Sequence, residues 1–258
     1  MAYWQQLLTI CSLVFFAGFV DSIAGGGGII SLPAYLIAGL PPTAALGTNK
    51  FSSTIGLSVA SWRFLKRGKA HLRAAVTAAV TALIGSAAGA ELIMLLDRFD
   101  ERYFSYILIA SLPLLAVFIL FNKRIGNDAP NRDLRGARMY VLSALAGLVI
   151  GAYDGFFGPG AGTFLIIVFN AVVGLDVLTA SGTAKIVNFA SNISALITFA
   201  ISGSVIVALA APAAVFSIAG NILGTRLAFK NGARIIRPAF IAVLTMLLVK
   251  IVYDTFLS

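Results

Sequence analysis

Two lysines are candidates for chemistry because each lies in an otherwise apolar stretch, shortly after a glycine-threonine pair. Lys50 ends the run Gly47–Lys50, and Lys185 ends the related run Gly182–Lys185. An ammonium group within a membrane helix costs roughly 2.5–3.5 kcal/mol on insertion scales and is a functional-site hypothesis by default. Two such groups would give a central site a positive potential, which favours an anionic ligand.

Two aspartates precede glycine-rich interruptions of the apolar sequence. Asp21 comes before Gly25–Gly28, and Asp154 comes before Gly158–Gly162. Glycine lets backbone N–H groups approach a ligand closely, and the helix after each break presents a positive N-terminal end that favours anions. Each carboxylate could cap the broken backbone, pair with a lysine or bind a coupling proton.

Structural roles compete with these functional ones. The glycines could serve only close helix packing, and the lysines could reach toward a membrane interface. A structural ion pair could form within each half of the chain, Lys50 with Asp21 and Lys185 with Asp154. The predicted substrate-binding set is Lys50, Lys185, Thr48, Asn49, Thr183, Asn188, Gly25, Gly26, Gly27, Gly158 and Gly160, with Asp21 and Asp154 as a coupling or structural pair and Ser53 and Asn192 as further neutral donors.

The composition places these residues in a membrane protein. The 258 residues are 59% hydrophobic and 11% charged, whereas soluble domains are about 25% charged. Most apolar segments approach the roughly 20 residues that a membrane-spanning helix needs, which predicts an all-α polytopic membrane protein. The first segment lacks the basic stretch of a cleaved signal peptide and is predicted to be retained. The predicted segments are Trp4–Val20, Ile29–Leu40, Thr43–Trp62, Ala70–Leu96, Tyr103–Phe121, Met139–Ala152, Gly162–Val173, Leu178–Ile201, Val205–Leu227 and Ile235–Phe256.

The sequence contains an internal repeat, which is informative because related halves usually mean related folds. The stretch Asp21–Gly27 reappears as Asp154–Gly160, and Gly47–Lys50 reappears as Gly182–Lys185. We therefore predict a first transmembrane repeat over residues 1–122, a cytoplasmic linker over 123–138 and a second repeat over 139–258. At the offset of the second pair, Gly85 meets Gly220 and Gly89 meets Gly224.

Equivalent loops of the two halves carry opposite charge. The loop after Trp62 is basic, its counterpart Ser202–Ser204 is uncharged, and the next pair of loops reverses this pattern. Basic loops stay in the cytoplasm, so the charges predict inverted-topology repeats with both termini outside. Inversion requires an odd number of crossings per half. Five crossings satisfy this, as do three crossings plus a re-entrant hairpin made from the first two segments.

Several other functions are excluded or disfavoured. The net charge of +9 is gathered in short loops between apolar segments, as in membrane proteins and unlike a nucleic-acid-binding surface. A single cysteine, Cys11, excludes an intramolecular disulfide and a multi-thiolate metal site. The sequence has no phosphate loop, no H-E-x-x-H and no cluster with metal-ligand spacing. We therefore predict a protein that is not an enzyme and has no cofactor or metal.

The paired motifs resemble those of the sulfite exporter TauE/SafE family, also called the toluene-sulfonate uptake permease family. The resemblance rests on Gly18–Gly28 with Leu46–Lys50, and on the degenerate second copy Gly151–Gly160 with Gly182–Lys185. It extends over essentially the whole chain. It implies a bacterial inner-membrane secondary transporter of small sulfur-containing anions such as sulfite or sulfonates.

The residues and the resemblance together predict a carrier with glycine-broken, re-entrant helices and a substrate site near the membrane midplane. Alternating access, driven by the proton motive force, would follow from exchanging the conformations of the two halves. Two alternatives remain open: an anion channel, and a cation-coupled transporter centred on Asp21 and Asp154. The expected partners are a small anion and the lipid bilayer, and a homodimer is one option for the oligomeric state.

Overall fold

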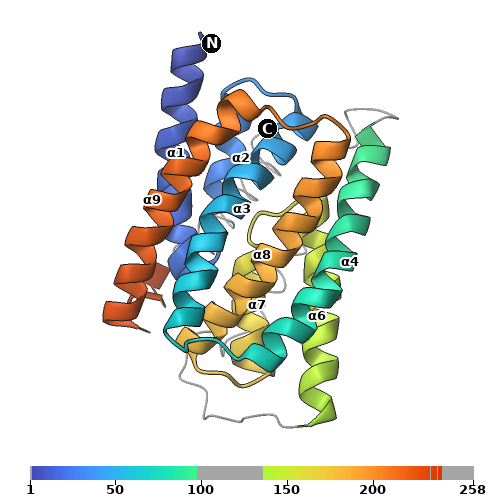
Figure 1. Cartoon of the computed structure of the whole chain (residues 1–258), viewed down its shortest axis with the longest axis vertical. Coiled ribbons are helices and arrows are strands. Elements are labelled where there is room, and N and C mark those ends of the chain that lie inside the picture. The colour runs from blue at the N-terminus through green and yellow to red at the C-terminus, as the bar shows by residue number, and fades with distance from the viewer. Residues whose placement is uncertain (1, 98–135, 233, 237, 240–258) are drawn as a thin grey trace, which may run out of the picture.

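The computed structural model describes residues 2–97, 136–232, 234–236 and 238–239, and these residues form helices without a strand. The elements of the first half are α1 (Tyr3–Ala24), α2 (Gly28–Ile37), α3 (Pro42–Lys66) and α4 (Leu72–Asp97). Those of the second half are α6 (Ala137–Phe156), α7 (Ala161–Ile167), the π-helical turn η1 (Val168–Val172), α8 (Val177–Ile201) and α9 (Val207–Asn231). Figure 1 shows them as one upright bundle with the short helices inside.

Helices α1, α4, α6, α8 and α9 are long and apolar enough to cross a membrane. Helix α3 has the same 25-residue length as α8, but the polar residues of Thr48–Thr54 lower its hydropathy. These elements confirm the all-α polytopic fold. The predicted segment Tyr103–Phe121, nearly all of Ile235–Phe256 and most of the predicted linker lie outside the described residues.

Helices α1 and α2 form a hairpin. Helix α1 ends at Gly25, whose φ of 82° lies in the left-handed region that glycine adopts without strain. The chain then turns back, and near the start of α1 the side-chain amide of Gln6 donates to the carbonyl of Ala38 just after α2 (2.8 Å). The end of α2 therefore lies beside the start of α1. The number of membrane crossings in each half stays a prediction.

The two central helices, α3 and α8, run in opposite directions (Figure 1). Thr48 near the start of α3 accepts a hydrogen bond from the backbone N–H of Ile206, just after α8 (3.1 Å). Thr183, its equivalent near the start of α8, accepts one from the N–H of His71, just after α3 (2.9 Å). Each helix therefore begins where the other ends. The threonine of each half makes the same kind of contact, so the two contacts are equivalent.

The outer helices exchange partners between the halves: α1 packs along α9, and α6 packs along α4. Small residues allow these close approaches. A Cβ added to Gly18 of α1 would lie 2.7 Å from the carbonyl oxygen of Ser217, and one added to Gly151 of α6 would lie 2.7 Å from Cα of Ala82. Gly151 is the repeat equivalent of Gly18, and Ala82 is that of Ser217. The halves thus interlock through equivalent surfaces, and residues of both meet at the centre.

Candidate functional site

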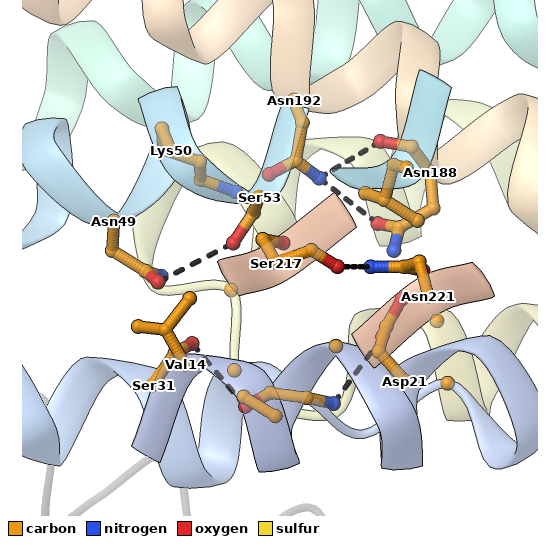
Figure 2. Close-up of a pocket in the computed structure, with 18 of the residues that line it drawn as sticks. Val14, Asp21, Ser31, Asn49, Lys50, Ser53, Asn188, Asn192, Ser217 and Asn221 are labelled. Carbon is orange, nitrogen blue, oxygen red and sulfur yellow. Dashed lines mark hydrogen bonds between the residues drawn. The ribbon is translucent and has the colours of Figure 1, made fainter. Parts of the chain in front are cut away.

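A cavity of about 500 Å³, including the part open to solvent, lies where the two halves meet. Its polar walls come from helices far apart in the sequence (Figure 2). The described lining residues are Val14, Ala17, Gly18, Asp21, Gly25, Gly27, Gly28, Ser31, Asn49, Lys50, Ser53, Leu57, Asp154, Gly158, Gly160, Gly162, Asn188, Asn192, Ser217 and Asn221.

Lys50 forms an ion pair with Asp154 at the wall of this cavity. The Lys50 Nζ lies 2.8 Å from Oδ1 of Asp154, and their side chains are only 2% and 5% exposed. The other carboxylate oxygen accepts hydrogen bonds from the hydroxyl of Ser191 and from the amide of Asn192 (3.0 Å). Asp154 therefore has three donors, a set that stabilises an ionised carboxylate away from water.

Lys185 pairs with Asp21 more loosely. Its Nζ lies 3.4 Å from Oδ2 of Asp21 and also donates to the Asp21 backbone carbonyl. The Asp21 side chain is 14% exposed, whereas that of Lys185 is fully buried. Oδ1 of Asp21 accepts a hydrogen bond from the backbone N–H of Gly27 (3.2 Å), which ties the carboxylate to the first glycine break. The two repeat-related pairs are therefore not equivalent in strength or in access.

Both ion pairs join one half of the chain to the other, so the prediction of pairs within each half is wrong. Lys50 of α3 meets Asp154 of α6, and Lys185 of α8 meets Asp21 of α1. The physical reason is the exchange of partners between the two halves of the chain. It places the first turns of each central helix, where the lysine lies, against helices of the other half of the chain. The alternative that the lysines reach to a membrane interface is also wrong, because both are buried against a carboxylate.

Burial of the lysines matches their depth along the helices. Each lies eight residues after the first residue of its helix, Pro42 in α3 and Val177 in α8. At 1.5 Å per residue this is about 12 Å of rise, within a helix of about 37 Å. Both ammonium groups are thus held well inside the bundle.

The two glycine breaks touch one another. A Cβ added to Gly25 would overlap the backbone of Gly162 and Thr163, and one added to Gly28 would lie 3.1 Å from Cα of Pro159. The hydroxyl of Thr163 donates to the carbonyl of Ala24 (3.0 Å). Irregular backbone at membrane depth requires such protein cover or a cavity. Here it has both, since Gly25 also lines the cavity.

The structure brings most of the predicted binding residues to the cavity. Asn49, Lys50, Asn188, Gly25, Gly27, Gly158 and Gly160 line it, together with the aspartates Asp21 and Asp154. The remaining members of the set, namely Lys185, Thr48, Thr183 and Gly26, are not among its described lining residues. Their role in substrate binding stays a prediction.

Among the further lining residues outside the predicted set, three have polar side chains: Ser31 of α2, and Ser217 and Asn221 of α9. They belong to neither repeated motif, and so the comparison of the halves did not select them. A signal was nevertheless present, because Asn221 is an amide in an apolar segment and directly follows Gly220. Within the described residues, no three His, Cys, Asp or Glu side chains come together as a metal site would require.

Thr48 and Thr183 lie fully buried at the helix-loop contacts that fix α3 against α8. Changing Thr48 to valine removes the acceptor of the partly buried Ile206 N–H, and the loss of one hydrogen bond costs about 0.5–1.5 kcal/mol. We expect Thr48→Val and Thr183→Val each to lower the stability to unfolding by this amount while the affinity for the transported anion stays unchanged. Thermal unfolding and ligand titration of the purified variants measure both. A selective loss of affinity in a stable variant would instead place the hydroxyl at the ligand.

Residues 10–251 match the family described as sulfite exporter TauE/SafE. The chain belongs to this family. It is similar to a probable membrane transporter protein of Haemophilus influenzae, with 33% identity over 251 residues and 96% of each chain covered. It is also similar to the probable membrane transporter protein YfcA of Escherichia coli K12, with 34% identity over 241 residues, 93% of this chain and 87% of the relative.

A third relative, the probable membrane transporter protein ORF9 of Sinorhizobium sp, is 34% identical over 242 residues, which cover 93% of this chain and 90% of the relative. No solved structure gives a significant match. This TauE/SafE protein is therefore a membrane transporter, and the five long apolar helices among its described residues agree with a multi-pass protein of the cell inner membrane.

Proposed function

We propose that this TauE/SafE protein moves small sulfur-containing anions, such as sulfite, sulfonates or related organic anions, across the inner membrane by alternating access. The observation that carries the proposal is the ammonium group of Lys50 at the wall of a cavity between the two halves. The amides of Asn49 and Asn188 and the glycines of both breaks line the same cavity and can donate hydrogen bonds to an oxyanion. The family description supports a sulfur oxyanion as the ligand.

Charge balance at the site couples the anion to a proton. Two lysines and two aspartates sum to zero formal charge when all four are ionised. An anion that enters alone leaves an uncompensated charge in a medium of low dielectric constant, which is strongly unfavourable. Protonation of one carboxylate restores neutrality. The anion and one proton then move in the same direction, so the pH component of the proton motive force favours uptake, and a large internal anion concentration drives export.

Asp21 is the proposed proton acceptor. It is partly exposed at the cavity, and its carboxylate has two donors at 3.2 and 3.4 Å, whereas Asp154 has three donors and is nearly buried. Asp154 can share Lys50 with the anion, because Ser191 and Asn192 continue to hold its other oxygen. The proton is therefore taken up by Asp21, the carboxylate with fewer hydrogen-bond donors, and the anion binds at Lys50, the ammonium group that lines the cavity.

Alternating access is proposed from the arrangement of equivalent helices. Their opposite directions and reciprocal contacts suit two halves that exchange conformations around a fixed central site. In the present conformation Lys50 lines the cavity and Lys185 does not. Exchange of the conformations would reverse this relation and open the cavity toward the other side of the membrane.

The experiment is counterflow in proteoliposomes. Vesicles loaded with unlabelled sulfite should take up labelled sulfite transiently and with saturable kinetics, and a sulfonate should compete. A channel would instead conduct steadily without counterflow. A cation transporter would exchange protons or sodium whether or not an anion is present. Absence of both exchange and binding for sulfite and all small sulfonates would overturn the proposal.

Asp21→Asn tests the coupling. We expect the variant to retain saturable anion exchange but to lose the proton uptake that accompanies it, because the amide does not titrate. Transport should lose most of its dependence on a pH gradient, which a pH-sensitive dye inside the vesicles reports. The matched control is Asp176→Asn, since Asp176 is exposed at the start of α8, caps the N–H groups of Leu178 and Thr179, and can be replaced there by asparagine. Unchanged proton movement in Asp21→Asn would contradict the assignment.

A further inference from the structure

Asn221 of α9 lines the cavity and carries an unpaired hydrogen-bond acceptor. The residue is 2% exposed and lines the cavity together with Ser217 (Figure 2). Its amide nitrogen donates to the carbonyl of Ser217, one turn earlier in the helix (2.9 Å). Since a carbonyl can only accept, this bond fixes which end of the amide faces the helix. The Oδ1 atom accepts no hydrogen bond from any residue that the structure describes.

The surrounding helices leave room for this amide by means of glycine. A Cβ added to Gly18 of α1 would lie 2.9 Å from the Asn221 amide nitrogen, and one added to Gly56 of α3 would lie 2.6 Å from it. Both distances are shorter than packed carbon and nitrogen atoms allow. Three helices are therefore shaped around one polar side chain at the edge of the cavity.

The repeat-related position behaves differently. The offset that aligns Gly85 with Gly220 makes Ser86 of α4 the repeat equivalent of Asn221. Ser86 is also buried, but its hydroxyl donates to the carbonyl of Ser191 (2.6 Å) and is satisfied. The Asn221 Oδ1 atom thus makes no hydrogen bond among the described residues, whereas the equivalent Ser86 hydroxyl makes one. A buried acceptor without a partner costs about 1–3 kcal/mol, and such exceptions in native proteins call for an explanation.

Asn221 lies apart from the cationic end of the cavity. It packs at Gly56, six residues after Lys50 on α3, which corresponds to about 9 Å of helix rise. Asp21, a second acceptor that lines the cavity, is one turn beyond Gly18 on α1. The Lys50 ammonium group and the Asn221 amide are therefore separated along the cavity, and Asn221 Oδ1 is the acceptor that has no partner among the described residues. A ligand that matches both groups carries an anionic group and, a few bonds away, a hydrogen-bond donor.

We propose that the Asn221 Oδ1 selects anions that carry a hydroxyl or similar donor group over anions of the same size that lack one. This inference rests on the proposed function, because the anionic group of the ligand is placed at Lys50. The specific bond is from the ligand donor to Oδ1. It satisfies the acceptor that the fold leaves free, and an apolar ligand end would leave that acceptor unpaired.

The test compares ethanesulfonate with 2-hydroxyethanesulfonate on the purified full-length protein. We expect 2-hydroxyethanesulfonate to bind about tenfold or more tightly than ethanesulfonate. This ratio of dissociation constants corresponds to the free energy gained when one buried acceptor receives a hydrogen bond. Asn221→Leu should bind ethanesulfonate at least as well as the wild type and should reduce the discrimination to about twofold or less. Asn221→Ala provides a smaller replacement in case leucine does not fit between the glycines. The matched control is Ser86→Ala, which should leave the discrimination unchanged.

The outcomes separate this inference from the proposed function. If both sulfonates bind the wild type equally, or if both Asn221 variants still discriminate, the acceptor subsite is wrong while the anion site stands. If neither sulfonate nor sulfite binds the wild type, the anion site itself is wrong. Loss of ethanesulfonate binding in a folded Asn221 variant would also overturn the inference, because Asn221 would then act on the anionic group.

Discussion

Lys50→Ala is expected to abolish anion transport and to lower the free energy of unfolding by about 3–5 kcal/mol. The stability loss arises because Asp154 stays buried, with its side chain 5% exposed, after its cation is removed. The transport loss arises because Lys50 is the lysine that lines the cavity. Thermal unfolding and counterflow of labelled sulfite measure the two effects on the same preparation.

The two effects can be separated by removing both charges. In Lys50→Met combined with Asp154→Asn, no buried charge is left unpaired, and we expect most of the lost stability to return. Ser191 and Asn192 can still bond to the new amide oxygen. Anion binding should remain absent, because the ammonium group is still missing. A double variant that is stable and still binds sulfite with wild-type affinity would contradict the assignment of Lys50 to the substrate.

Lys185→Ala serves as the comparison from the other half. Its partner Asp21 is 14% exposed at the cavity, whereas Asp154 is 5% exposed, so we expect a smaller loss of stability than for Lys50→Ala. The repeat alone predicts equal effects, since the two lysines occupy equivalent positions. Unequal effects would follow only from the unequal surroundings of the two ion pairs.

Most of the helices could be predicted from the sequence, and their neighbours could not. The lengths of the apolar stretches locate α1, α3, α4, α8 and α9 to within a few residues, because a membrane-spanning helix is one continuous apolar stretch of sequence. The repeat offset shows which residues are equivalent, but equivalence does not say which residues touch. The crossed ion pairs depend on the packing of α1 against α9 and of α6 against α4, which no local pattern encodes.

The candidate site shows the same division. Lys50 could be selected because a charge in an apolar helix is costly and therefore informative. Thr48 could not be assigned from its motif, because a buried hydroxyl can serve either a ligand or a backbone N–H, and here it accepts from Ile206. Asn221 carries no charge and belongs to no repeated motif. Its proposed role rests on two structural observations, namely that the residue lines the cavity and that its Oδ1 is unpaired among the described residues.

Gly25→Ala is the second change with a large expected effect, because two independent penalties coincide at this residue. Gly25 has a φ of 82°, and alanine in the left-handed region costs roughly 1–2 kcal/mol. The new Cβ would also lie 2.6 Å from the backbone nitrogen of Thr163 and 2.7 Å from the carbonyl oxygen of Gly162. Overpacking against backbone that cannot rotate away costs about 1–3 kcal/mol more. We expect a total loss of about 2–5 kcal/mol in unfolding free energy.

Two control variants isolate the two penalties. Gly203→Ala places alanine at a φ of 74° with no atom within 4 Å, so it carries only the backbone penalty. Gly162→Ala places a Cβ 2.9 Å from the carbonyl oxygen of Gly25 without a left-handed φ, so it carries only the overlap. If the crossing of the two glycine breaks is what holds the halves together at the site, the loss in Gly25→Ala should approach the sum of these two. Sulfite exchange should then fail in Gly25→Ala and persist in Gly203→Ala. A Gly25→Ala protein as stable as Gly203→Ala would mean that the two breaks do not meet.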